Sequence, residues 1–297
     1  MKNINRRKFI QTSLKGLAGI SVMGSGVAFP AYGATVSDVV DNVKLGASGL
    51  TVPRIALGTG SHAGGGGSNQ TRLGASGFVK LARHAHDHGI RFFDMADTYG
   101  SHTYVKEALK EIPREQTNLL SKIWVQESSW YTIEPVSKTL DRFRLETNTD
   151  YFDIVLMHCL MRGDWRESKK SFMDQFSRAK DDGIIRAVGV SCHNWDAMVE
   201  AAEEPWVDVI MARINPFGTH MDNTPEKVMA LLEKAKNNGK GIIGMKIFGN
   251  GDNVSDEERE RSIAYSVSSG NVHSLTLGLE SPTQINDAIE RVMRNVG

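Results

Sequence analysis

Short apolar strand patterns alternate with amphipathic helical patterns along this chain, with a period of roughly 30 residues, and this alternation constrains the fold most. Strands that each lead into a helix favour a parallel sheet whose connections are helices. The predicted strands number eight, at 54–57, 91–93, 117–121, 151–157, 185–190, 207–212, 241–245 and 272–277. Helical patterns include those at 77–87, 133–145, 169–182, 225–238 and 282–294.

Glycine follows several of these helical patterns just before the next strand, as in Asp182-Gly183 and Asn238-Gly239, and is typical of helix ends. Two short strand patterns at 43–45 and 50–52 predict a hairpin ahead of the first unit. We therefore expect an α/β fold: a single (β/α)₈ TIM barrel with an N-terminal β-hairpin, spanning residues 35–297. An open doubly wound sheet is disfavoured because no strand is followed by G-x-G-x-x-G.

Residues 1–34 differ from the rest: they contain five basic residues and no acidic one. The segment at 5–10, NRRKFI, matches the twin-arginine export pattern, and an uncharged stretch rich in glycine, alanine and serine follows. We expect a twin-arginine-type signal peptide at 1–34, with a disordered basic tail as the alternative. It implies the twin-arginine export machinery as a partner. The protein would be cytoplasmic before export and periplasmic or otherwise exported afterwards.

Charge and cysteine content exclude several classes of function. Without the five N-terminal charges the chain has 30 basic and 35 acidic residues, which argues against nucleic-acid binding. Only Cys159 and Cys192 are present, too few for a disulfide framework. Both follow strand patterns, so they could form one disulfide, but buried thiols are the preferred interpretation. Their number and spacing predict no metal site.

Polar residues stand where three successive strand patterns end. Asp94 ends the strand in RFFDMADTYG and Tyr99 follows five residues later, Lys122 lies near the end of NLLSKIW, and His158 near the end of YFDIVLMHC. In a (β/α)₈ barrel the carboxyl ends of the strands surround one mouth, where active sites lie. Each residue alone could be structural, for example a helix-capping aspartate or a buried histidine. Together they indicate a catalytic group.

These motifs resemble the aldo-keto reductase family over residues 43–297. The similar segments are LGTG at 57–60, DxADxYG at 94–100, YFDIVLMH at 151–158, GVSCHNW at 189–195, INPF at 214–217 and GLESPTQI at 278–285. The resemblance implies an oxidoreductase that uses NAD(P)H to reduce small aldehydes or ketones, or runs the reverse reaction. Tyr99 would be the proton donor, Lys122 would lower its pKa, Asp94 would hold Lys122, and His158 would orient the substrate oxygen.

The resemblance further implies that Thr59, Ser191, Met211 and Met245 contact the cofactor, with Ser191 near the nicotinamide carboxamide. The chain departs from the family here. Cys192 replaces a common asparagine, Met211 a common glutamine and Met245 a common aromatic residue. A methionine can still cover a ring face, although both methionines could equally be barrel filling.

At the adenosine end, the resemblance implies contacts from Gly278, Glu280, Ser281, Gln284 and Asp287. A basic residue near the 2′-phosphate is usual in members that prefer NADPH, and this segment has none. Glu280 could accept a hydrogen bond from a ribose 2′-hydroxyl, or could simply be a first-turn helix acid. The choice between NADH and NADPH stays open.

Trp124 is predicted to line the substrate entrance, and a small carbonyl compound is the expected partner. Two other functions stay open: a nucleotide-binding sensor or interaction module with little turnover, and another (β/α)₈ enzyme such as a lyase. A lyase would need metal ligands or a Schiff-base lysine, and Lys246, the other strand-end lysine, has no evident role. The substrate, the reaction direction and the oligomeric state do not follow from the sequence.

Overall fold

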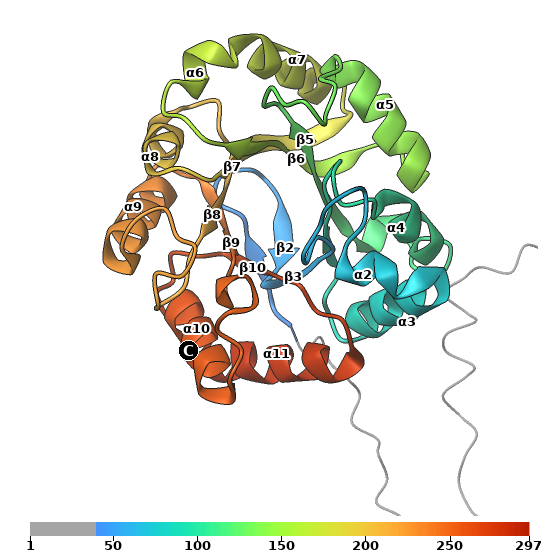
Figure 1. The fold of residues 1–297 in the computed structure, drawn as a ribbon, viewed down its shortest axis with the longest axis vertical. Helices are drawn as coiled ribbons and strands as arrows, with labels where there is room; N and C mark the ends of the chain where they lie inside the picture. Colours follow the sequence, from blue (N-terminus) through green and yellow to red (C-terminus); the bar gives the residue numbers. More distant parts are fainter. Residues whose placement is uncertain (1–39, 297) are drawn as a thin grey trace, which may run out of the picture. The chain divides into compact units, whose positions relative to one another are not determined.

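Eight parallel strands close into a barrel in the computed structural model, which describes residues 40–296 (Figure 1). The strands are β3 (Ile55–Gly58), β4 (Phe92–Asp94), β5 (Asn118–Trp124), β6 (Phe152–Leu160), β7 (Ile185–Cys192), β8 (Val209–Arg213), β9 (Gly241–Met245) and β10 (Ser274–Leu277). Neighbours in sequence pair in order, and β10 pairs with β3 to close the barrel. The predicted TIM barrel is confirmed. The predicted signal peptide at 1–34 lies outside the described residues.

Helices surround the barrel on all sides in the view along its axis (Figure 1). They are α2 (Asn69–Arg72), α3 (Gly74–Asp87), α4 (His102–Ala108), α5 (Val136–Thr147), α6 (Trp165–Ser168), α7 (Lys170–Asp181), α8 (Trp195–Glu203), α9 (Pro225–Asn237), α10 (Asp256–Ser268) and α11 (Pro282–Asn295), with short 3₁₀ turns η1 (Arg114–Gln116) and η2 (Gly249–Gly251). No helix within residues 40–296 is long and apolar enough to span a membrane.

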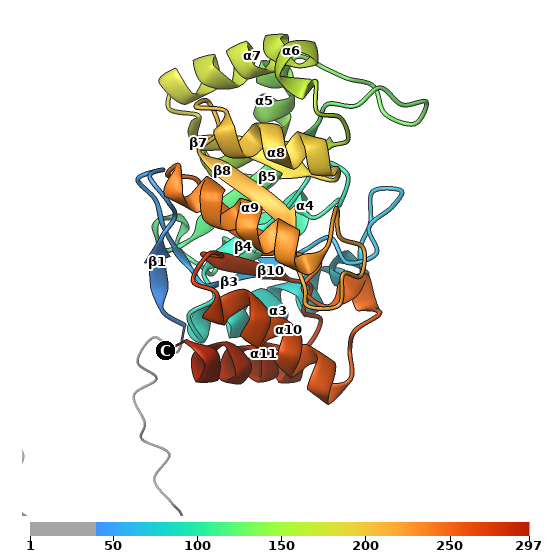
Figure 2. The same ribbon diagram turned by 90° about the vertical axis from the view of Figure 1, so that its left-hand side faces the viewer.

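Apolar side chains form two separate layers of core. One layer lies between the strands and the helices, and the other fills the barrel interior. The predicted hairpin, β1 (Asn42–Lys44) and β2 (Thr51–Pro53), adds Leu45, Leu50 and Val52 to the interior cluster. The hairpin therefore plugs one end of the barrel, while the loops after β3 and β5 extend from the opposite end (Figure 2).

Local chemistry explains where the helices begin and end. Gly183 and Gly239 have φ values of 73° and 83°, so these predicted helix ends use a conformation that glycine adopts readily. The helix predicted at 133–145 begins later, at Val136, because Pro135 disfavours helical geometry in the residue before it. The helix predicted at 169–182 is found as α7 at Lys170–Asp181, and Lys169 separates it from the preceding short helix α6.

Several strands extend beyond their predicted ends, β5 and β6 furthest, and this changes the position of two site residues. Strand β5 continues to Trp124 and β6 to Leu160, so Lys122 and His158 lie within strands and not after them. The pairing of β6 with β7 shifts between Met157 and Leu160, where Cys159 adopts a φ of 63°. This irregularity resembles a β-bulge, a feature common beside active sites.

Candidate active site

Alternate residues of each strand face the barrel interior, and this alternation directs the polar side chains to the mouth. Leu120 of β5 and Leu156 of β6 belong to the interior cluster. Lys122 and His158 lie two residues further along these strands, so they face the same way. The same period of two applies to β4, which ends at Asp94.

Lys122 lies between Asp94 and Tyr99 at this mouth. Its Nζ donates hydrogen bonds to a carboxylate oxygen of Asp94 and, at 2.9 Å, to the carbonyl oxygen of Met95. The same nitrogen lies 3.4 Å from the Tyr99 hydroxyl oxygen. The second Asp94 oxygen accepts a hydrogen bond from Thr276 Oγ1 at 2.8 Å. The predicted pairing of Asp94 with Lys122 is confirmed, and both side chains are buried.

Burial and charge act in opposite directions on the two proton-bearing groups. Burial alone would lower the pKa of Lys122, but the charge of Asp94 and the interaction with Tyr99 raise that pKa above its ordinary value. Burial raises the pKa of Tyr99, and the charge of Lys122 only partly opposes this. Lys122 lowers the pKa of Tyr99, as expected, but burial outweighs this contribution, so the pKa lies above its ordinary value and the phenol keeps its proton at neutral pH.

His158 contacts both aromatic residues of the mouth. Its ring is edge-to-face with Tyr99 and with Trp124, at centroid distances of 5.8 Å and 5.4 Å. Burial lowers the pKa of His158, and a nearby carboxylate, that of Asp97, opposes this effect. Trp124 in turn packs against Trp130, which is 60% exposed, at a centroid distance of 4.7 Å.

Asp97 is a site residue that the sequence prediction missed. Its side chain is fully buried, and its Oδ1 lies 3.5 Å from His158 Nδ1. Its Oδ2 accepts the backbone N–H of Trp124 at 2.6 Å. Neither Asp97 Oδ1 nor His158 Nδ1 has a hydrogen bond of standard geometry within the described chain, although the two atoms lie close enough for an ion pair when the imidazole is protonated. The signal was available, because Asp97 is the second aspartate of DxADxYG.

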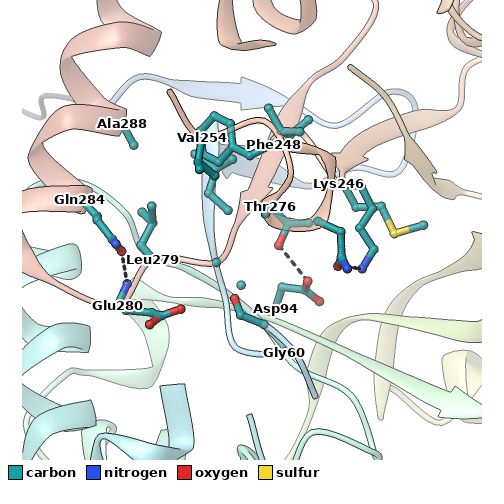
Figure 3. A pocket seen from close by; sticks show the side chains of 18 of the residues that line it. Gly60, Asp94, Lys246, Phe248, Val254, Thr276, Leu279, Glu280, Gln284 and Ala288 are labelled. Atoms are coloured by element: carbon teal, nitrogen blue, oxygen red, sulfur yellow. Dashed lines mark hydrogen bonds between the residues drawn. The ribbon is translucent and has the colours of Figure 1, made fainter. Parts of the chain in front are cut away.

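A cavity of about 440 Å³ opens beside Tyr99 and Asp94 and reaches the start of α11 (Figure 3). Strands β3, β4, β8, β9 and β10 contribute to its wall, together with the segment after β9 and the first turns of α10 and α11. Of the predicted cofactor residues, six line it: Met211, Met245, Gly278, Glu280, Gln284 and Asp287. Thr59, Ser191 and Ser281 do not belong to its lining.

A family model described as "Aldo/keto reductase family" matches residues 54–294. The chain belongs to the aldo/keto reductase family. It is therefore an NAD(P)H-dependent oxidoreductase, as predicted, and the choice between the two nucleotides stays open.

Several curated members of this family are similar in sequence. Methylglyoxal reductase DkgB of Escherichia coli O157:H7 is 26% identical over 211 residues, which cover 70% of this chain and 71% of that protein. An NADH-specific methylglyoxal reductase of Escherichia coli K12 is 26% identical over 66% of this chain and 64% of its own length. Aldo-keto reductase family 1 member A1 of Mus musculus is 39% identical, but only over 30% of each chain.

Solved structures of aldo-keto reductases share the fold. A putative member from Pseudomonas aeruginosa superposes with a TM-score of 0.72 at 20% identity, covering 89% of this chain and 99% of that one. The holo form of a member from Bacillus halodurans gives a TM-score of 0.68 at 16% identity, covering 85% and 91%.

The residues around the mouth fit a nicotinamide. Ser191 Oγ is buried and has no hydrogen-bond partner within the described chain, so a polar group of a ligand could satisfy it. Ser191 pairs in register with Met211, which lines the cavity together with Met245. The neighbouring Cys192 is fully buried and free, so its side chain adds no hydrogen-bonding group to the mouth. The roles of Ser191 and the two methionines stay predictions.

At the adenosine end, several predicted residues already have partners. Glu280 accepts a hydrogen bond from Asn69 Nδ2 at 2.7 Å, and its backbone N–H donates to Gln284 Oε1 at 2.7 Å. Ser281 Oγ caps α11 by accepting the backbone N–H of Gln284. Asp287 receives three hydrogen bonds from Arg291. Two of the main-chain amides that could face a phosphate are thus already engaged by side chains.

Arg259 lines the part of the cavity that is predicted to hold the adenosine, and the sequence prediction missed it. Its Nε lies 3.2 Å from Asp287 Oδ2, and its Nη1 donates to the Val254 carbonyl oxygen at 2.6 Å. Arg259 belongs to α10, in the charged run DEERER, where one arginine is not distinguishable from another. The expectation that no basic residue lies near this end held only for the segment 278–287.

The LGTG segment supports the catalytic residues. Thr59 is fully buried, and its hydroxyl lies within hydrogen-bonding distance of the Asp94 carbonyl oxygen, at 2.8 Å, and of Ser101 Oγ, at 2.7 Å. A Cβ on Gly60 would meet the Tyr99 ring at 2.3 Å, so only glycine allows the phenol to pack here. Direct contact of Thr59 with the cofactor stays a prediction.

Both cysteines are free thiols, Cys192 fully buried and Cys159 partly so, which agrees with the preferred interpretation of the sequence. Within residues 40–296, no group of three or more His, Cys, Asp or Glu side chains is arranged to hold a metal ion.

Proposed function

We propose that this enzyme reduces small aldehydes or ketones to alcohols, or catalyses the reverse reaction, with Tyr99 as the proton donor. The observation that carries this proposal is the buried series Asp94–Lys122–Tyr99 beside the cavity. A hydride acceptor needs a proton on its oxygen as negative charge develops there. Tyr99 keeps its proton at neutral pH, and the nearby Lys122 ammonium stabilises the phenolate left after transfer.

Each residue of the mouth has a distinct task in this proposal. The bound dihydronicotinamide supplies the hydride. Asp94 keeps Lys122 charged, Tyr99 gives its proton to the substrate oxygen, and His158 orients that oxygen through its ring. Trp124 forms one wall of the substrate site, packed edge-to-face against His158. In the reverse direction Tyr99 accepts the proton.

Small carbonyl compounds are the favoured substrates. Three of the curated relatives are named methylglyoxal reductases, and methylglyoxal is a small dicarbonyl compound. The mouth is lined by aromatic and polar side chains together, and Trp124 packs against the exposed Trp130. Such a site accepts compact polar carbonyl compounds.

The proposal is tested by Tyr99→Phe, which removes the proton donor and keeps the ring. We expect kcat/KM for carbonyl reduction to fall by at least about 100-fold, while the Kd for the nucleotide changes little. Steady-state kinetics and a fluorescence titration with NADH and NADPH measure the two quantities. Turnover close to that of the unmodified enzyme would show that another group donates the proton.

We also propose that the enzyme is exported by the twin-arginine route. The support is the sequence alone: the arginine pair at 6–7, the uncharged stretch after it and the lack of acidic residues before Asp38. Fractionation of cells that express the full chain measures its location.

A further inference from the structure

Lys246 lines the cavity together with Tyr99 and Asp94, although the proposed reaction gives it no task. It follows the last residue of β9 directly. In Figure 3 it lies beyond Asp94 and away from Gln284 and Glu280, which mark the adenosine end. Lys246 therefore borders the part of the cavity nearer to Asp94 and Tyr99.

The backbone of Lys246 is held in an unusual conformation. Its φ is 56°, in the left-handed region that residues other than glycine and asparagine seldom adopt. Asn215, fully buried, donates a hydrogen bond to the Lys246 carbonyl oxygen at 3.2 Å and another to the Thr219 carbonyl oxygen at 2.9 Å. The position of Lys246 is thus fixed by its neighbours, and glycine would fit this backbone with less strain.

The ammonium group of Lys246 has no anionic partner within residues 40–296. It donates one hydrogen bond, at 2.5 Å, to Asn250 Oδ1, which is a neutral amide oxygen. No carboxylate of the described chain forms an ion pair with it. Partial burial lowers the pKa of Lys246, and the positive charges of Arg213 and Lys122 lower it further. A half-buried cation close to other cations is stabilised when an anion binds beside it.

The surrounding charges identify the side of the cavity that this anion would occupy. The groups that interact electrostatically with Lys246 are Arg213 on β8, Lys122 on β5 and Cys159 on β6. Arg213 is itself compensated, because it forms an ion pair with Asp222, whose side chain is 1% exposed. The unbalanced positive charge is that of Lys246, on the substrate side.

We propose that Lys246 binds a carboxylate of the substrate, so that the preferred substrates are oxo acids or aldehydes that carry a carboxylate close to the carbonyl group. The inference rests on the proposed carbonyl reduction. Hydride and the Tyr99 proton add across the C=O bond, and the carboxylate is unchanged. The diphosphate of the nucleotide offers similar anionic oxygens, and the experiment must separate the two sources.

The first arm compares acids with their methyl esters in the unmodified enzyme and in Lys246→Met, which keeps the aliphatic stem. Suitable pairs are pyruvate with methyl pyruvate, and succinic semialdehyde with its methyl ester. We expect kcat/KM for the acids to fall by about 10- to 100-fold, the range for a hydrogen bond to a charged group. For the esters it stays within about twofold, and Lys246→Arg recovers most of the activity with acids.

The second arm measures binding without turnover. Oxamate, a non-reducible analogue of an oxo acid, is titrated against each variant in the presence of NADH, and NADH is titrated alone. We expect weaker oxamate binding in Lys246→Met and an unchanged Kd for NADH. Lys138→Met, on the exposed face of α5, removes a lysine far from the cavity and serves as the matched control.

If Lys246→Met lowers kcat/KM equally for acids and esters, or also raises the Kd for NADH, the proposal is overturned and Lys246 belongs to the nucleotide site. Unchanged kinetics and unchanged oxamate binding would overturn it as well. If the unmodified enzyme reduces no acid or ester but binds oxamate through Lys246, the anion site stands and carbonyl reduction is wrong.

Discussion

Lys122 keeps its charge because its ammonium group has several hydrogen-bond acceptors. Burying an ammonium group is costly unless it is paired and hydrogen-bonded, and a lysine left alone at this depth would lose its proton. Lys122 has the Asp94 carboxylate, the Met95 carbonyl oxygen and the Tyr99 hydroxyl within 3.4 Å. Thr276 satisfies the other Asp94 oxygen and so fixes the carboxylate. The phenol therefore faces a permanent cation.

Asp97 should act as a positioning residue for His158. Its negative charge favours the protonated imidazole, so removing that charge lowers the pKa of His158 further below its ordinary value. We expect Asp97→Asn to lower kcat by about 10- to 100-fold, because the imidazole is no longer held in one orientation. NMR titration of the His158 ring and the pH dependence of kcat measure the two effects.

Asp150→Asn provides the control for Asp97→Asn, since Asp150 is exposed and lies outside the cavity. A purely structural role for Asp97 would reduce stability or expression but leave the pKa of His158 where it is. That outcome would contradict the positioning role.

Among the elements, the barrel and its strands were predictable, but the exact site was not. Periodicity placed all eight strands because a parallel barrel strand is a short apolar run between helices. The ends of β5 and β6 were predicted too early because Lys122 and His158 interrupt the apolar pattern. The strands continue through both residues, whose side chains are buried at the mouth of the barrel. In a strand, residues two apart face the same way. Continuing this rule along β8 and β10 would have predicted that Arg213, two residues after Met211, and Thr276, two residues after Ser274, also face the barrel interior.

Some contacts of the site could not be found from the sequence because they join elements that are distant along the chain. Arg259 reaches the adenosine end only because α10 packs beside α11, where Asp287 receives it. The partnership of Asp97 with His158 depends on the order of β4, β5 and β6 in the barrel. Neither contact has a local sequence pattern.

The first turns of α10 and α11 should set the choice of nucleotide. Within residues 40–296 the Glu280 carboxylate has only the neutral Asn69 amide as a partner, whereas Arg259 shares its charge with Asp287 and Asp256. The unbalanced carboxylate should repel a 2′-phosphate, so we expect NADH to bind better than NADPH. Glu280→Gln should shift the ratio of the two Kd values toward NADPH by about 5- to 30-fold. Fluorescence titration measures both constants.

Glu290→Gln, on the exposed part of α11, is the control for the change at Glu280. A strong preference of the unmodified enzyme for NADPH would mean that Arg259 dominates this end of the cavity. In that case Arg259→Ala, and not Glu280→Gln, would alter the ratio.

At the scale of the whole molecule, closure of the barrel depends on the pairing of its first and last strands. β3 at Ile55–Gly58 pairs with β10 at Ser274–Leu277, and Ser274 Oγ donates a hydrogen bond to the Pro53 carbonyl oxygen across 221 positions. The cavity is lined by strands from both ends of the chain, since β3, β4 and β10 all contribute to it. The nucleotide site is therefore complete only after the entire chain has been made and folded. Twin-arginine export, which carries folded proteins, is compatible with this requirement.

An exported enzyme of this family should carry its nucleotide with it, because no pool of free nicotinamide nucleotide is expected outside the cytoplasmic membrane. We expect the mature protein, residues 35–297, to bind the nucleotide before export and to release it slowly. Retention at nanomolar protein requires about 12 kcal/mol of binding free energy, which a ligand held along the whole cavity can reach.

The protein is purified from the exported fraction without added cofactor and denatured, and the supernatant is assayed for nucleotide. The same protein with Arg6 and Arg7 changed to lysine, purified from the cytoplasm, is the control. Nucleotide-free exported protein with micromolar affinity would contradict retention and favour an enzyme that works in the cytoplasm.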